Sequence, residues 1–128
     1  MQAKLKSTQP LLTRHIQSSL YDIQGFVNYH NVQKYLNIRV KSIALALGKT
    51  PRALEINPQS EGIQKGLKKF VYIFQLLKEM LETEQEILVW LRAPNPDFEG
   101  LSPLDIIVDG KMDAIVEYLE EIKRGALV

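Results

Sequence analysis

The sequence lacks cysteine, and this absence excludes several classes of protein at once. None of the 128 residues is a cysteine, so disulfide frameworks, thiol catalysis and thiolate metal sites are excluded. Long hydrophobic runs are also missing: no apolar stretch reaches the roughly 18 residues that a membrane-spanning helix needs. Met1 to Pro10 contains no continuous apolar segment of the kind found in signal peptides. We therefore expect a cytoplasmic protein that does not interact with membranes.

Residues suited to catalysis or metal binding are few and scattered. The two histidines, His15 and His30, are far apart, and neither has an acidic residue nearby in a metal-ligand pattern. Acidic residues cluster between Glu79 and Glu86 and between Asp113 and Glu121, but with the helical spacing and apolar partners typical of solvated helix faces. The sequence therefore predicts no enzyme, no cofactor and no bound metal.

Helical periodicity dominates the chain, and no pair of strands is apparent. Apolar residues recur at helical spacing from Leu11 to Leu20, from Phe26 to Leu36 and from Val40 to Leu47. Further helices are predicted after Thr83, after Ser102 and around Val116–Ile122, because capping residues precede them or apolar residues repeat along them. The predicted fold class is all-α, with about seven helices.

The strongest helical pattern runs from Gln59 to Leu81. Its apolar face is wider than a single stripe, so it must be covered on more than one side. Either the chain's own core or a second subunit can provide that cover, and a second subunit would indicate a symmetric homodimer. The candidate dimer-interface residues share the middle of this helix: Phe70, Ile73, Phe74 and Leu77.

The net charge of +1 conceals two halves of opposite charge. Residues 1–69 carry eight lysines and three arginines against three acids, a net charge of +8. Residues 70–128 carry three lysines and two arginines against twelve acids, a net charge of −7. This asymmetry favours two surfaces with different partners, although ordinary solvated helix faces remain an alternative.

The stretch from Arg39 to Asn57 resembles the helix-turn-helix of Xre-type repressors. It reads as a helix, a turn at Gly48 and a second helix capped by Thr50. In such a unit the start of the second helix enters the major groove of operator DNA. The candidate DNA-binding residues are Lys41, Lys49, Thr50, Arg52 and Lys65. Lys49 stands where that pattern usually has an apolar residue, and Asn57-Pro58 shortens the second helix, so a helix pair serving only as scaffold is the alternative.

The most specific stretch is WLRAPNPDFEGLSPLD, from Trp90 to Asp105. Pro94 ends one helix, and Pro94 and Pro96 force the residues before them towards extended conformations. Ser102 then caps the next helix. From the residues alone, this stretch is either a connector between helices or a stiff surface that a partner recognises, because stiffness lowers the ordering cost of binding.

The same residues resemble the toxin-binding domain of Xre/MbcA/ParS-type antitoxins. The resemblance is carried by Trp90–Pro96, Gly100 and Ser102–Asp105, and Val116–Gly125 is similar to the final helix of that family. With the helix-turn-helix-like segment it spans roughly Arg39 to Val128. It implies an antitoxin of a type II toxin–antitoxin system that neutralises a RES-domain, NAD-consuming toxin by covering its active-site cleft. It also implies a homodimer that represses its own operon.

Carried over to this sequence, the resemblance implies two groups of toxin-binding residues. One group surrounds the prolines and the other forms the C-terminal tail: Trp90, Arg92, Pro94, Asn95, Pro96, Asp105, Ile122, Lys123, Arg124, Gly125 and Val128. The sequence departs from the family in two places. Asp97-Phe98-Glu99 replaces small, usually apolar residues, and Lys123-Arg124 stands where members often have Glu-His.

These observations predict two domains, residues 1–69 with the helix-turn-helix-like region and residues 70–128 with the toxin-binding domain. Two other functions remain open. The basic half favours a stand-alone helix-turn-helix DNA-binding regulator without a toxin. A helical adaptor that binds an unrelated protein is the third interpretation.

Overall fold

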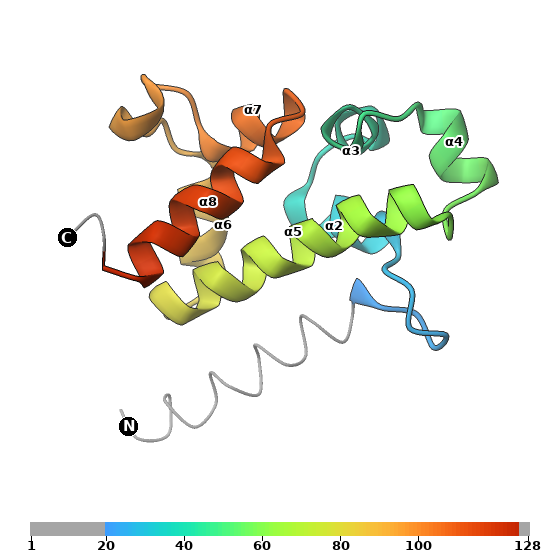
Figure 1. Cartoon of the computed structure of the whole chain (residues 1–128), viewed down its shortest axis with the longest axis horizontal. Coiled ribbons are helices and arrows are strands. Elements are labelled where there is room, and N and C mark those ends of the chain that lie inside the picture. The colour runs from blue at the N-terminus through green and yellow to red at the C-terminus, as the bar shows by residue number, and fades with distance from the viewer. Residues whose placement is uncertain (1–19, 126–128) are drawn as a thin grey trace.

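The computed structural model describes residues 20–125 of the chain, and this part is helical (Figure 1). The elements within it, in chain order, are α2 (Tyr29–Leu36), α3 (Val40–Leu47), α4 (Pro51–Ile56), α5 (Glu61–Met80), α6 (Glu84–Arg92), the 3-10 helix η1 (Pro96–Phe98), α7 (Pro103–Val108) and α8 (Met112–Lys123). The described residues contain no strand, only an isolated antiparallel bridge between Tyr21 and Val27. The all-α prediction is confirmed.

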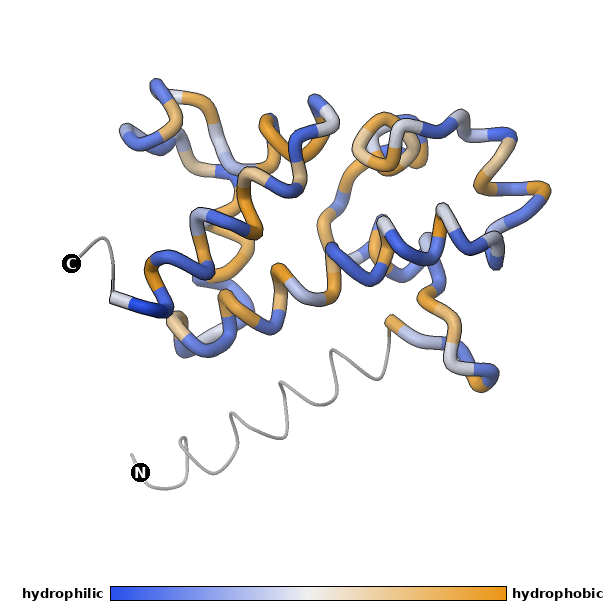
Figure 2. The backbone as a smooth tube through the Cα atoms, viewed as in Figure 1, coloured by the Kyte–Doolittle hydropathy of each residue, from blue (hydrophilic) through white to orange (hydrophobic). Residues whose placement is uncertain are grey.

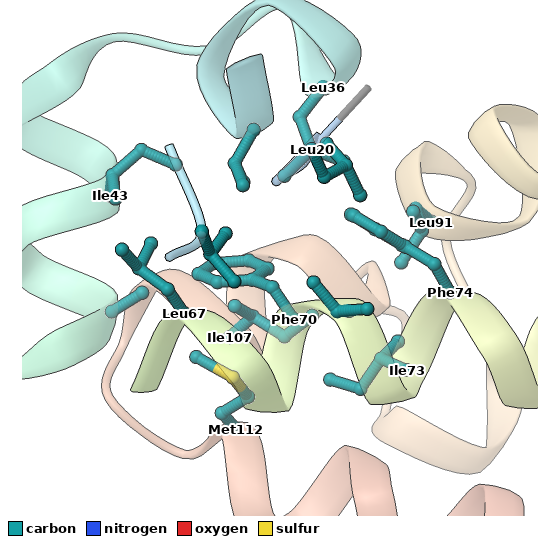
Figure 3. Packing of buried hydrophobic residues seen from close by; sticks show 14 of the residues in the cluster. Leu20, Leu36, Ile43, Leu67, Phe70, Ile73, Phe74, Leu91, Ile107 and Met112 are labelled. Atoms are coloured by element: carbon teal, nitrogen blue, oxygen red, sulfur yellow. The ribbon is translucent and has the colours of Figure 1, made fainter. Parts of the chain in front are cut away.

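Helix α5 is the axis of the fold: α2, α3, α6 and α8 pack along it, α7 packs on α6, α8 and α3, and α4 packs on α3 (Figure 1). Hydrophilic and hydrophobic residues alternate along α5 and α8, as amphipathic helices require (Figure 2). Side chains from α2, α3, α6, α7 and α8 converge on the apolar face of α5 (Figure 3). Phe70 lies within this cluster and is fully buried. The described residues therefore share one hydrophobic core.

The width of the apolar face of α5 is accounted for within one chain. The four residues predicted to form a dimer interface are all buried by other parts of the same chain: Phe70 (0% exposed), Ile73 (0%), Phe74 (1%) and Leu77 (1%). A second copy cannot contact side chains that are already enclosed. The assignment of these residues to a dimer interface is therefore corrected: of the two alternatives, the chain's own core provides the cover, with side chains from α2, α3, α6, α7 and α8.

The division of the chain between residues 69 and 70 falls in the middle of α5, which continues without interruption from Glu61 to Met80. The core likewise extends across this position, from Leu67 to Phe70 and beyond. A division at this point can therefore separate the chain by charge and by proposed function only, because both regions are packed on the same helix.

Local chemistry sets the helix ends, and one end differs from the sequence prediction. The second helix was expected from Phe26, but α2 begins at Tyr29 because the side chain of Asn28 accepts hydrogen bonds from the amides of His30 and Asn31. Val27 instead pairs with the buried Gln64: the Val27 N–H donates to Oε1 (2.9 Å), and Nε2 donates to the Val27 carbonyl (3.0 Å). The helix expected from Leu11 lies outside the described residues, except for Leu20.

α3 approaches α5 closely at a glycine. A Cβ at Gly66 would overlap the end of the Leu47 side chain on α3, so a larger residue there would require that side chain to shift. This contact fixes the helix-turn-helix-like segment on the first half of α5. Within residues 20–125, every helix is too short or too polar to span a bilayer.

Candidate functional site

The segment between α6 and α7 forms a stiff loop, Pro94–Leu101. The residues before its two prolines are extended, as predicted: Ala93 has φ −78° and ψ 143°, and Asn95 has φ −122° and ψ 123°. Ala93 closes α6 with a hydrogen bond from its amide to the carbonyl of Val89 (2.9 Å). The prolines thus end α6 and fix the direction in which the chain leaves it.

Asn95 closes the loop on itself. Its amide donates to the carbonyl of Leu101 (3.0 Å), and its own carbonyl accepts from the amides of Phe98 (2.9 Å) and Gly100 (3.0 Å). Its side-chain Oδ1 accepts from the amide of Asp97 (2.9 Å). The loop turns back through two successive left-handed residues, Glu99 (φ 57°) and Gly100 (φ 85°). Its shape is therefore determined by its own backbone before any partner binds.

An aromatic cluster attaches this loop to α8. The ring of Tyr118 stacks on Trp90 with centroids 6.3 Å apart, and it meets the edge of Phe98 at 4.7 Å. The Tyr118 hydroxyl donates to Oδ2 of Asp97 (2.6 Å). Tyr118 therefore contacts both α6 and η1 from its position on α8. Burial first, and then the bond to Asp97, raise the pKa of Tyr118 above its usual value, so its hydroxyl stays protonated at neutral pH.

Arg92 and Asp105, two further residues predicted to bind the partner, also make hydrogen bonds within the chain. The guanidinium of Arg92 donates to the carbonyls of Leu36 and Asn37, at the C-terminal end of α2, where helix carbonyls lack intrahelical partners. The carboxylate of Asp105 accepts from the amide of Ser102 (3.1 Å), while the Ser102 hydroxyl accepts from the Asp105 amide (3.0 Å). This capping box starts α7. Both residues shape the segment.

The C-terminal end of α8 is held against α5 by polar contacts. Tyr72 donates to Oε2 of Glu120 (2.7 Å), and Lys123 forms a salt bridge with Glu79 (3.1 Å). Ile122 is half-buried, whereas Arg124 and Gly125 are exposed. Val128 lies outside the described residues. Figure 1 places this end of α8 and the Pro94–Leu101 loop on the same side of the molecule, and α3 and α4 on the other.

Comparison with known proteins identifies this part of the chain. Residues 76–125 match the family described as the antitoxin Xre/MbcA/ParS C-terminal toxin-binding domain. Residues 76–125 therefore form a toxin-binding domain of the Xre/MbcA/ParS type, which marks the chain as an antitoxin. The recognition made from the Trp90–Asp105 motif is confirmed.

A solved structure agrees with this assignment at the level of the fold. The antitoxin is similar to a chain in the crystal structure of the M. tuberculosis MbcT-MbcA toxin-antitoxin complex, with a TM-score of 0.50 and 21% sequence identity. The similarity covers 77% of the antitoxin and 93% of that chain. No curated protein matches.

The toxin-binding domain uses residues that the sequence interpretation did not select. Asp97 and Phe98 were noted only as a departure from the family pattern, and Tyr118 was not selected at all. In the antitoxin these three residues attach the loop to α8. Nothing in a separation of 21 residues between Asp97 and Tyr118 indicates that they meet, because the contact is created by the packing of α8 against α6 and α7.

The helix-turn-helix-like segment of the antitoxin lies at the opposite end of the molecule (Figure 1). α3 ends at Gly48 (φ 67°), and the Thr50 hydroxyl accepts from the amide of Ala53 (3.1 Å) to start α4. α4 has only six residues, as Asn57-Pro58 predicted. All five candidate DNA-binding side chains are exposed: Lys41, Lys49, Thr50, Arg52 and Lys65.

An open cleft of about 320 Å³ lies beside this segment. It is lined by the end of α3, the first half of α5 and the turn before α8. Lys65 and Lys69 line it from α5, and Lys69 pairs with Asp113 of α8 (2.8 Å). The cleft therefore carries a lysine, Lys65, that takes part in none of the salt bridges between described residues.

Proposed function

We propose that this antitoxin neutralises a RES-domain, NAD-consuming toxin by covering the toxin's active-site cleft with its C-terminal domain. The observation that carries the proposal is the match of residues 76–125 to a toxin-binding domain, together with the fixed arrangement of its loop and last helix. RES-domain toxins are the partners that the resemblance to Xre/MbcA/ParS antitoxins implies.

Inhibition of this kind is steric and electrostatic. The Pro94–Leu101 loop is closed by its own hydrogen bonds, so little conformational entropy is lost when it docks. The net charge of −7 over residues 70–128 favours a partner with a basic surface and speeds their encounter. In our proposal the tail from Ile122 onwards enters the toxin cleft, and the folded domain behind it excludes the substrate.

Co-expression tests this function. The adjacent reading frame is expressed with the full-length antitoxin or with a variant truncated after Glu121. We expect the product of this frame to be toxic when expressed alone and the full-length antitoxin to restore growth. The truncated antitoxin should fail to restore growth, although circular dichroism should show that it remains helical. If the full-length chain neither restores growth nor co-purifies with the frame's product, the proposal is wrong.

We further propose that the α3–α4 segment binds operator DNA and represses the antitoxin's own operon. The support is the exposed start of α4, where Thr50 and Arg52 flank Pro51 and Lys49 precedes them. No salt bridge between described residues neutralises Lys49 or Arg52. A stand-alone DNA-binding regulator would use the same surface, and failure of the toxin test with retention of DNA binding would favour it.

Salt dependence provides the test of DNA binding. Binding to the promoter DNA is measured at several salt concentrations for the wild type and for Lys49→Ala. If Lys49 contacts a phosphate, the slope of log affinity against log salt falls by about one unit in the variant. Lys111→Ala is the control, because Lys111 is an exposed lysine within the toxin-binding domain and is paired with Asp109. Equal slopes for Lys49→Ala and the wild type would contradict the assignment.

A homodimer remains part of this proposal, because two DNA-binding units would match a palindromic operator. Its interface must use surface other than the buried face of α5. Light scattering coupled to gel filtration at micromolar concentration is expected to give twice the 14.7 kDa chain mass. A monomeric mass would remove the dimer from the proposal.

A further inference from the structure

Tyr118 is the point at which three elements of the toxin-binding domain meet. It lies on α8, stacks on Trp90 of α6 and contacts both Asp97 and Phe98 of η1. The hydrogen bonds of Asn95 to Asp97, Phe98, Gly100 and Leu101 give the loop its internal shape, and the Asn95 side chain also interacts with the Tyr118 hydroxyl on α8. The orientation of the loop relative to α8 therefore depends on Tyr118.

Tyr118 also lies on the face of α8 that leads to the tail. Tyr118 and Ile122 are four residues apart, so they share one face of the helix and are separated by one turn, about 6 Å along its axis. A residue that fixes the loop at this position sets the distance between the loop and the start of the tail. The two groups of toxin-binding residues thus have a common structural support.

We propose that Tyr118 is a positioning residue for toxin binding, which holds the Pro94–Leu101 loop and the end of α8 as one rigid surface. This inference rests on the proposed function, because it assigns to the same domain a second element that contacts the toxin besides the tail. Asp97 and Glu99 are exposed on the loop, so a correctly held loop presents an acidic surface beside the tail.

The experiment separates the hydrogen bond from the aromatic packing. Tyr118→Phe keeps the ring and removes the hydroxyl that binds Asp97, and Asp97→Ala removes the acceptor. Affinity for the purified product of the adjacent reading frame is measured by calorimetry for both variants and for the double variant. Each single change is expected to lower the affinity about three- to ten-fold, the range given by one hydrogen bond. The double variant should bind no more weakly than the weaker single variant, because both changes break the same bond.

Two further measurements distinguish positioning from a loss of folding or of charge. Hydrogen exchange of the amides in residues 96–101 should accelerate in Tyr118→Phe, while the melting temperature and the fluorescence of Trp90, the single tryptophan, change little. Glu99→Gln removes one charge from the same loop without touching Tyr118, so it should weaken toxin binding less than Asp97→Ala, which also breaks the bond to Tyr118.

The outcomes are distinct. If Tyr118→Phe accelerates exchange in the loop but binds the toxin like the wild type, the loop does not need positioning and the inference is wrong. It is also wrong if exchange is unchanged, or if Glu99→Gln weakens binding as much as Asp97→Ala, since charge alone would then explain the loss. If the wild-type antitoxin does not bind the product of the adjacent reading frame at all, the proposed function fails, and the positioning role of Tyr118 fails with it.

Discussion

The two ends of the molecule use their polar residues in opposite ways. At the α3–α4 end, Lys41, Lys49 and Arg52 are exposed, and none of the salt bridges between described residues involves them. At the other end, Arg92 and Asp97 are committed to contacts within the chain. Unpaired basic side chains suit a partner that offers phosphates at many positions, such as DNA. Internally bonded polar residues instead build a surface of defined shape, which suits a single protein partner.

This difference coexists with a shared core, and the largest effect we expect comes from breaking that core. Phe70→Ala removes a fully buried side chain from the middle of α5, where both ends pack. We expect a loss of about 3–5 kcal/mol in the free energy of unfolding. Urea unfolding followed by circular dichroism and by Trp90 fluorescence should give one coincident transition. Two separate transitions would show that the ends are independent domains.

The link between the ends is probed by Arg92→Met, which keeps the aliphatic stem and removes the guanidinium. The variant leaves the carbonyls of Leu36 and Asn37, at the end of α2, without this donor. We expect a loss of about 1–3 kcal/mol in urea unfolding, because groups near the core then lack a hydrogen-bond partner. A stability equal to the wild type would show that water replaces Arg92 at no cost.

Matched helix caps compare the two ends directly. Ser102 is buried and forms a reciprocal capping box, whereas Thr50 is exposed and accepts a single bond. Replacing a helix cap by alanine costs about 0.5–2 kcal/mol of stability. We expect Ser102→Ala near the top of this range and Thr50→Ala near the bottom. The measurement is the midpoint of thermal unfolding for each variant. If Thr50→Ala costs more, the α3–α4 end is the more strongly determined of the two.

The smallest effect is expected at Tyr35, which packs its ring edge-on against Phe74 at 4.8 Å. Its hydroxyl is buried and has no hydrogen-bond partner among the described residues. Tyr35→Phe keeps the ring and removes this hydroxyl, so at neutral pH we expect a change from zero to about 1 kcal/mol of added stability. A clear loss of stability would show that the hydroxyl has a partner.

Alkaline pH sharpens the same test. Burial first, and then the charge of Glu84, raise the pKa of Tyr35 above its usual value of about 10. The unfolded chain therefore releases this proton at lower pH than the folded chain, and stability falls as the pH rises above about 10. Below about pH 10 both the folded and the unfolded chain keep this proton, so stability does not change with pH through Tyr35. Tyr35→Phe should make the decline shallower, as measured by urea unfolding between neutral and alkaline pH.

Much of the local structure was predictable from the sequence because it depends on short-range chemistry. Thr50 and Ser102 cap helices, Pro94 ends one, and the residues before the prolines are extended, all as expected. The start of α2 was misjudged, because the pairing of Val27 with Gln64 draws the preceding residues out of the helix. That pairing spans 37 residues and leaves no pattern in the local sequence.

The sequence by itself determined the all-α fold, the ends of most helices and the motif from Trp90 to Asp105 that marks the toxin-binding domain. These features follow from periodicity, capping residues and proline, which act within a few neighbours along the chain. Only the tertiary structure decided what covers the wide face of α5 and what holds the loop. The packing of α6, α7 and α8 buries Phe70 and Phe74 within one chain, and it brings Tyr118 to Asp97, because such contacts depend on how helices meet in space.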